Sequence, residues 1–234
     1  MNNTILFTAL LPIAILAYYI VRKDRLSPEP PGQLIKAFLF GILSIPVSMC
    51  ISGPLCSLGF FTNNPATMGE AVATSFYGAA IPEEIAKFLM FWLVVRKNRY
   101  FDERMDGIVY AVCVSLGFAA VENVMYLVSN SEAFVSVGIA RALFAVPGHF
   151  CFGIAMGYYY SLARFYPGAS SKTKALVLAA PIVIHGLYDS ILFVSSVTPA
   201  ISGLLTIVFL FFCHKMWKFA SRKIEEHLSR DRFC

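Results

Sequence analysis

The chain has 234 residues, of which 58% are hydrophobic and 14% charged, and its mean hydropathy is +0.68. Soluble domains carry roughly a quarter of charged residues, so this composition excludes an ordinary soluble domain. The net charge of +5 would suit a nucleic-acid-binding protein, but the placement of the basic residues argues against that class.

Seven apolar segments are each long enough to cross a bilayer, which takes about 20 mostly apolar residues. They cover about residues 4–21, 34–53, 71–95, 106–128, 135–162, 174–194 and 199–219. The first has no basic residue before it, so we interpret it as a retained span and not a cleaved signal peptide. The sequence therefore predicts an all-α membrane bundle of about seven transmembrane helices. Residues 1–220 would form one transmembrane helical domain and residues 221–234 a short basic cytoplasmic tail.

Basic residues alternate between the two sides of the predicted bundle. They follow the first, third, fifth and seventh segments: Arg22, Lys23 and Arg25; Arg96, Lys97, Arg99 and Arg104; Arg164, Lys172 and Lys174; and Lys215, Lys218, Arg222, Lys223, Arg230 and Arg232. The loops after the second, fourth and sixth segments contain neither Lys nor Arg. Because cytoplasmic loops are enriched in Lys and Arg, we expect the N-terminus outside, the C-terminus in the cytoplasm, and membrane lipids but no nucleic acid as partners.

After the residues near the ends of the apolar segments are set aside, eight charged or histidine side chains remain inside them. They are Glu83, Glu84, Lys87, Glu122, Arg141, His149, His185 and Asp189. Each charge near the bilayer centre costs at least about 2.5–3.5 kcal/mol, so these groups must face one another or a wet cavity. At about 1.5 Å per residue, the acids and histidines lie roughly 15–24 Å from the cytoplasmic ends of their segments. Four helices can therefore bring them to one depth.

The local spacing of these residues predicts two short polar clusters. Lys87 lies four residues after Glu83 and three after Glu84, so it can neutralise one of the two carboxylates. His185 and Asp189 are four residues apart on one helical face, so the carboxylate can fix the tautomer of the imidazole. Arg141 is interpreted as structural, either snorkelling to the interface or pairing with an acid.

This set of groups suits hydrolysis of an amide bond inside the membrane. One of Glu83 and Glu84 could act as a general base on water, and the spacing leaves open which one. Glu122, His149 and His185 could bind a divalent metal, for which we expect zinc. Without metal, the two histidines could instead donate to a developing oxyanion. No HExxH or GxSxG motif is present.

Four short motifs, in order along the chain, resemble one known family. They are EExxK at Glu83–Lys87, FxxxE(N) at Phe118–Asn123, a segment from Arg141 to His149, and HxxxD at His185–Asp189. Over about residues 5–195 the chain is similar to the PrsW family of bacterial intramembrane proteases, which is related to the CAAX prenyl endopeptidase (Abi) superfamily.

The resemblance implies site-1 cleavage of a single-span substrate, a membrane-anchored anti-sigma factor, in the inner membrane as part of a stress response. It also implies that six residues have catalytic roles: Glu83, Glu84, Glu122, His149, His185 and Asp189.

Two other classes of function remain open from the residues alone. A proton-coupled transporter could use the same Glu, Lys and His side chains as a relay, although the sequence has none of the internal repeats typical of transporters. A non-catalytic membrane scaffold would need the polar groups only for packing.

Overall fold

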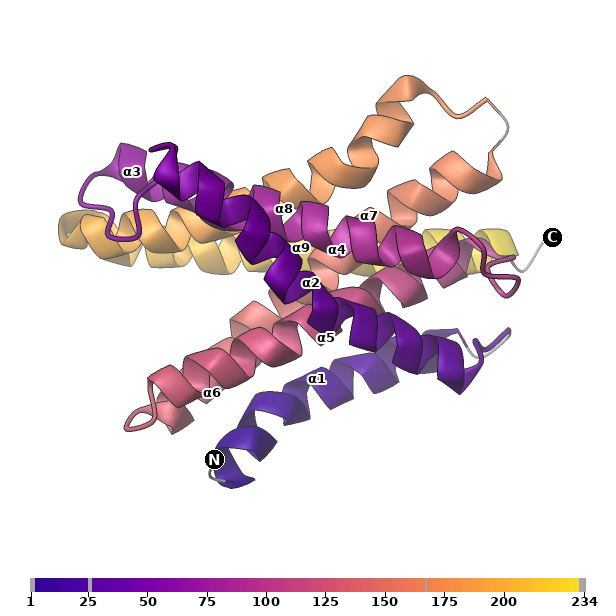
Figure 1. Cartoon of the computed structure of the whole chain (residues 1–234), viewed down its shortest axis with the longest axis horizontal. Helices are drawn as coiled ribbons and strands as arrows, with labels where there is room; N and C mark the ends of the chain where they lie inside the picture. Colours follow the sequence, from indigo (N-terminus) through magenta and orange to yellow (C-terminus); the bar gives the residue numbers. More distant parts are fainter. Residues whose placement is uncertain (1–2, 25–26, 167, 232–234) are drawn as a thin grey trace.

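The computed structural model describes residues 3–24, 27–166 and 168–231, and all the elements found in these residues are helices (Figure 1). The all-α prediction is therefore confirmed. The elements are α1 (Asn3–Lys23), α2 (Pro31–Ser57), α3 (Met68–Ala73), the π-helix η1 (Thr74–Ala80), α4 (Ile81–Val95), α5 (Arg104–Ser129), α6 (Phe134–Ala140), the π-helix η2 (Arg141–Ala145), α7 (Val146–Phe165), α8 (Ser171–Val197), the 3-10 helix η3 (Pro199–Ile201) and α9 (Ser202–Asp231).

Six helical stretches are long and apolar enough to cross a membrane. They are Asn3–Lys23, Pro31–Ser57, Arg104–Ser129, Phe134–Phe165, Ser171–Val197 and Pro199–Asp231. The seventh predicted span is also helical, from Met68 to Val95, as three consecutive segments. It carries Glu83, Glu84 and Lys87 within five residues, whereas each of the other six has an apolar stretch of 18 residues with at most two charged side chains.

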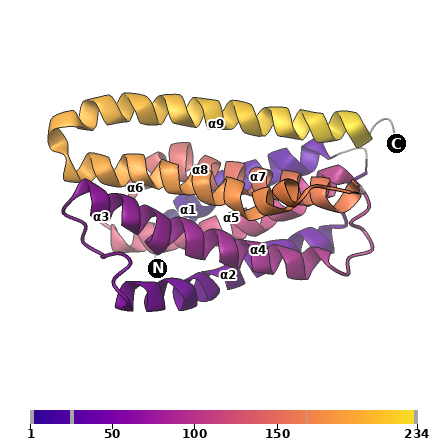
Figure 2. The same cartoon turned by 90° about the horizontal axis from the view of Figure 1, so that it is seen from above.

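The helices run back and forth between the two ends of an elongated bundle (Figures 1 and 2). The segments after α1, α4 and α7 and the C-terminal end of α9 lie at one end, and the segments after α2, α5 and α8 lie at the other. Three pairs join segments at the first end: Lys23–Glu225 at 2.8 Å, Arg104–Asp231 at 2.9 Å and Arg230–Tyr166 at 2.6 Å. Which end faces the cytoplasm stays a prediction, and Arg25 and Arg232 lie outside the described residues.

Helix α9 is longer than the sequence predicts, because it continues from Phe219 to Asp231. Its length of about 45 Å exceeds the ~30 Å hydrocarbon core of a bilayer. The additional turns are held by packing, since Ile224, His227 and Leu228 are buried against the bundle. Most of the predicted basic tail is thus a helix that packs on the bundle, and residues 232–234 lie outside the described residues. The domain division at residue 220 stays a prediction.

Helix α5 forms the centre of the bundle and packs most extensively on α7 and α2. The close approach to α7 depends on glycine, because a Cβ atom on Gly157 would lie 2.2 Å from the carbonyl oxygen of Gly107. The approach to α2 has the same origin: a Cβ on Gly117 would lie 2.1 Å from the carbonyl oxygen of Phe38. These contacts fix the position of α5 and therefore of Glu122 on it.

Replacing Gly157 with Ala is expected to destabilise the protein by about 1–3 kcal/mol, because the two helix backbones must separate to admit the methyl group. Gly203→Ala is the matched control, since a Cβ there would meet no atom within 4 Å. Thermal unfolding in detergent should show a lower melting temperature for Gly157→Ala alone. Equal melting temperatures for the two variants would contradict the role assigned to this helix contact.

Candidate active site

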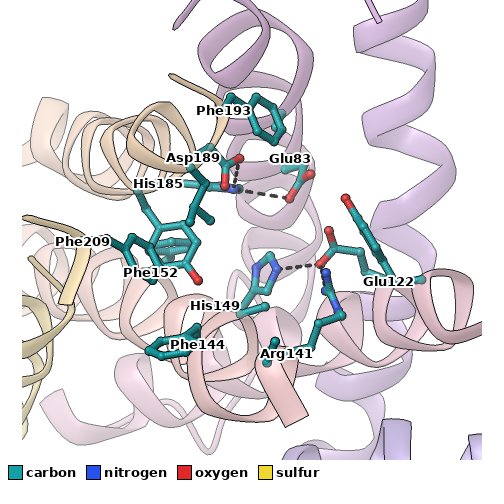
Figure 3. A pocket seen from close by; sticks show the side chains of 16 residues that line it. Glu83, Glu122, Arg141, Phe144, His149, Phe152, His185, Asp189, Phe193 and Phe209 are labelled. Carbon is teal, nitrogen blue, oxygen red and sulfur yellow. Dashed lines mark hydrogen bonds and ion pairs between the residues drawn. The ribbon is translucent and has the colours of Figure 1, made fainter. Parts of the chain in front are cut away.

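A cavity of about 360 Å³ lies between α4, α5, η2, α7, α8 and α9 (Figure 3). Its charged and ionisable lining residues are Glu83, Glu122, Arg141, His149, His185 and Asp189. The remaining lining is apolar and aromatic, with Phe144, Phe152, Phe193 and Phe209 around the polar groups. The structure thus brings together, from four separate predicted spans, the side chains that the sequence selected.

Lys87 lies behind the cavity and connects three of the polar groups. Its Nζ atom is 2.8 Å from Glu84 Oε1, 3.2 Å from Glu83 Oε2 and 3.1 Å from His149 Nδ1. The side chain is 1% exposed, and its ammonium lies 4.1 Å from the centre of the Phe118 ring. A buried cation is tolerated only when it is closely paired. Lys87 therefore ties α4 to α7 and holds two carboxylates in place.

Glu83 and Glu84 are adjacent in sequence but occupy different environments. Glu84 is fully buried, and its Oε1 accepts hydrogen bonds from Lys87 and, at 2.9 Å, from His185 Nδ1. Glu83 lines the cavity and its side chain is 15% exposed. A molecule in the cavity can therefore reach Glu83, whereas Glu84 is covered.

His185 is oriented from both sides of its ring. Because Nδ1 faces the carboxylate of Glu84, it carries the hydrogen and donates it. Nε2 then points into the cavity, 3.3 Å from Asp189 Oδ2 and 4.0 Å from Glu83 Oε2. Phe152 stacks on the imidazole, with ring centroids 4.5 Å apart. The predicted contact between His185 and Asp189 is present, and the carboxylate of Glu84 adds a second partner.

Glu122 and His149 form a second pair across the cavity. Glu122 Oε2 lies 2.8 Å from His149 Nε2 and 2.7 Å from Arg141 Nη2. Arg141 Nε also donates to Asn123 Oδ1 at 2.6 Å. Of the two interpretations of Arg141, pairing with an acid is the one found. Because the ammonium of Lys87 donates to Nδ1 of His149, the ring hydrogen is on Nε2 and points toward Glu122.

Two π-helices set the position of the site residues along their helices. Each ends just before a proline: η1 before Pro82 and η2 before Pro147. Proline lacks an N–H group and its ring collides with the preceding helical turn, so the wider π turn makes room for it. Single π turns are frequent at functional sites. The helix continues through both prolines, which stand at the starts of α4 and α7.

Sequence reasoning missed two contacts that complete the site. The approach of Lys87 to His149 joins residues 62 positions apart, and no local spacing predicts such a contact. Ser115 Oγ donates to the carbonyl oxygen of His149 at 2.6 Å. A serine within an apolar span is a weak signal by itself, because it can also donate to its own helix.

A family described as "PrsW family intramembrane metalloprotease" matches residues 29–214 of this chain. The chain belongs to the PrsW family. Protease PrsW of Clostridioides difficile strain 630 is 32% identical over 99% of this chain and 94% of its own length. Protease PrsW of Geobacillus kaustophilus is 34% identical over 92% of this chain and 87% of its own. Protease PrsW of Bacillus subtilis strain 168 is 33% identical over 77% of this chain and 78% of its own length.

No solved structure matches the chain significantly. Membership of the PrsW family decides between the three classes of function: the chain is a protease, and therefore a hydrolase, with multiple membrane spans. The transporter and scaffold alternatives are set aside. The description of the family as a metalloprotease supports a metal ion.

The cavity of this PrsW protein has donors that suit a divalent ion, because imidazole nitrogen and carboxylate oxygen both bind zinc. Two ligands of one ion, each about 2.0–2.2 Å from it, lie roughly 3–3.5 Å apart. His185 Nε2 and Asp189 Oδ2, at 3.3 Å, meet that separation. His149 Nε2 and Glu122 Oε2, at 2.8 Å, are at hydrogen-bond distance instead.

The predicted metal ligands Glu122, His149 and His185 all line the cavity but do not form one tight group. Within the described ranges, only one group of three His, Cys, Asp or Glu side chains has all its ligand atoms within 4.8 Å of one another. It lies elsewhere, at Asp24, Glu103 and Asp106. The two ring nitrogens of His149 are also both occupied, by Lys87 and Glu122. The predicted set of three stays a prediction.

Proposed function

We propose that this protease cuts a peptide bond in or near the transmembrane segment of a single-span protein, and that a membrane-anchored anti-sigma factor in the bacterial inner membrane is the substrate. The observation that supports this proposal is the sharing of one cavity by three partly exposed carboxylates and two buried histidines. The four motifs by which the sequence resembles the PrsW family include these same residues.

In the proposed reaction, Glu83 takes a proton from the water that attacks the substrate carbonyl, and returns it to the amine that leaves when the C–N bond breaks. Its carboxylate lines the cavity, and Lys87 at 3.2 Å keeps it close to the histidines without covering it. Glu84 acts through its neighbours, because it orients His185 and neutralises Lys87. Proton transfer by a positioned carboxylate contributes about 10²–10⁴-fold to a hydrolysis rate. Glu83 is therefore assigned as the base that the sequence left unassigned.

His149 is proposed to donate to the oxyanion that develops on the substrate carbonyl. Its Nδ1 accepts from Lys87, so Nε2 carries the hydrogen; this N–H is bonded to Glu122 at 2.8 Å, and substrate would have to draw it from that carboxylate. Donors that are already oriented before the reaction stabilise a developing oxyanion by several kcal/mol. Arg141, whose guanidinium pairs with Glu122 at 2.7 Å, keeps this carboxylate from taking the proton of His149.

A divalent ion in this cavity would be held by His185 and Asp189, with the carboxylate of Glu84 behind the ring as the orienting partner. Such an ion supplies Lewis-acid polarisation of the substrate carbonyl. We expect zinc, because imidazole nitrogen and carboxylate oxygen are common zinc ligands.

Metal content is expected to show that His185 binds the ion and His149 does not. Elemental analysis of detergent-purified protein should find about one zinc ion per chain in the wild type, little in His185→Ala, and an unchanged amount in His149→Ala. Loss in both variants would support the predicted set with Glu122 and His149 instead. Absence of zinc from all three proteins would leave hydrolysis to the water activated by Glu83.

The proposed substrate is tested by co-reconstitution of the protease with membrane-anchored anti-sigma factors from its own genome, beside single-span proteins of unrelated function. Cleavage of an anti-sigma factor alone, lost in Glu83→Gln, is the expected result. Cleavage of unrelated single-span proteins at the same rate would refute the assigned substrate and leave the protease activity in place.

A further inference from the structure

Three carboxylates meet at the end of the bundle that carries the basic loops, away from the active-site cavity. Asp24 follows the last residue of α1, Glu103 is the N-cap of α5, and Asp106 lies in the first turn of α5. One oxygen from each lies within 4.8 Å of the others. The cluster thus joins two helices that are far apart in the sequence.

Two of these carboxylates are buried without the partners that burial demands. Asp24 is 3% exposed and Asp106 is fully buried. Among the residues that the structure describes, Asp24 Oδ2 and Asp106 Oδ1 have no hydrogen-bond partner. The other oxygen of Asp106 accepts from the backbone N–H groups of Asp102, at 2.9 Å, and Glu103, at 2.6 Å. A buried carboxylate oxygen without a donor is costly, so each of the two points to a missing partner.

The nearby side chains increase the negative charge of the cluster. Glu29 is buried next to Asp106 and accepts a hydrogen bond from Tyr110. Two basic residues next to the cluster in the sequence have acidic partners of their own, since Lys23 pairs with Glu225 and Arg104 with Asp231. No ion pair within residues 3–24, 27–166 and 168–231 includes Asp24, Glu103 or Asp106.

We propose that Asp24, Glu103 and Asp106 bind a hard divalent cation, Ca²⁺ or Mg²⁺, which fastens the end of α1 to the start of α5. Both ions prefer oxygen ligands, and this cluster offers only oxygen. Ligands on opposite sides of Ca²⁺ lie about 4.6–5.2 Å apart, so three oxygens within 4.8 Å of one another fit within the coordination sphere of Ca²⁺. The site is distinct from the zinc site proposed above, which includes an imidazole.

The site is tested by titrating the full chain, purified in detergent and stripped with chelator, with CaCl₂ or MgCl₂ at constant ionic strength. Calorimetry should find about one ion bound per chain, and the melting temperature should rise by about 2–4 °C at saturation. Asp24→Asn removes a charge without breaking a hydrogen bond of the described residues, and Glu103→Gln serves as a second variant. Each should weaken binding by about tenfold or more.

Two controls separate this site from other sources of binding. Glu225→Gln removes an acid from the same end of the bundle, where it is exposed and paired with Lys23, and should bind the ion as the wild type does. His185→Ala should also bind it, so a failure of the proposed catalytic mechanism leaves this result unaffected. Binding of neither ion, or equal binding by the wild type, Asp24→Asn and Glu103→Gln, would overturn the proposal.

Discussion

Glu83→Gln is expected to slow peptide cleavage by about 10²–10⁴-fold, because the amide keeps the shape of the side chain but cannot take a proton from water. Glu83 faces the cavity and is partly exposed. The melting temperature of the Glu83→Gln variant in detergent should stay near that of the wild type, because Lys87 keeps Glu84 as its closest carboxylate partner at 2.8 Å. The measurement is single-turnover cleavage of a reconstituted single-span substrate.

Glu84→Gln is the matched comparison, since it makes the same chemical change one residue along the chain. Glu84 is fully buried and supports both Lys87 and His185. Losing its charge leaves the Lys87 ammonium with a weaker partner, so stability should fall by about 1–3 kcal/mol. If Glu84→Gln abolishes cleavage without loss of stability while Glu83→Gln remains active, the roles assigned to the two residues are reversed.

Lys87→Met is expected to destabilise the protein by about 3–5 kcal/mol, the usual result of breaking a buried ion pair from one side. Met has a similar length but leaves the carboxylate of Glu84 buried with no cation in contact. The hydrogen bond to His149 Nδ1 is also lost. Thermal or denaturant unfolding in detergent measures the change.

Lys23→Met is the control for Lys87→Met, because it removes a lysine whose partner Glu225 is well exposed. Exposed pairs contribute at most about 1 kcal/mol, so its melting temperature should change little. Adding Glu84→Gln to Lys87→Met should restore part of the lost stability, since the uncompensated charge is then gone. Equal melting temperatures for Lys87→Met and the wild type would show that Lys87 does not hold this network together.

The sequence by itself determined the helical class, the positions of the apolar helices and the set of polar residues inside them. Each span must satisfy its own backbone hydrogen bonds, so the length of an apolar run defines a helix without knowledge of its neighbours. The cost of a charge in the membrane selects residues such as Glu122 and His185 from the same information. The alternation of the loops between the two ends also follows from the count of spans.

Tertiary structure alone decided how these polar residues are arranged. Glu83 faces the cavity and Glu84 does not because the rotation of α4 is set by packing against other helices, including the approach of Lys87 to His149. The extension of α9 depends on burial of Ile224 and Leu228 in the bundle. The meeting of Asp24 with Asp106 depends on how the end of α1 packs on the start of α5. Such contacts join distant residues, and the local spacing of side chains contains no information about them.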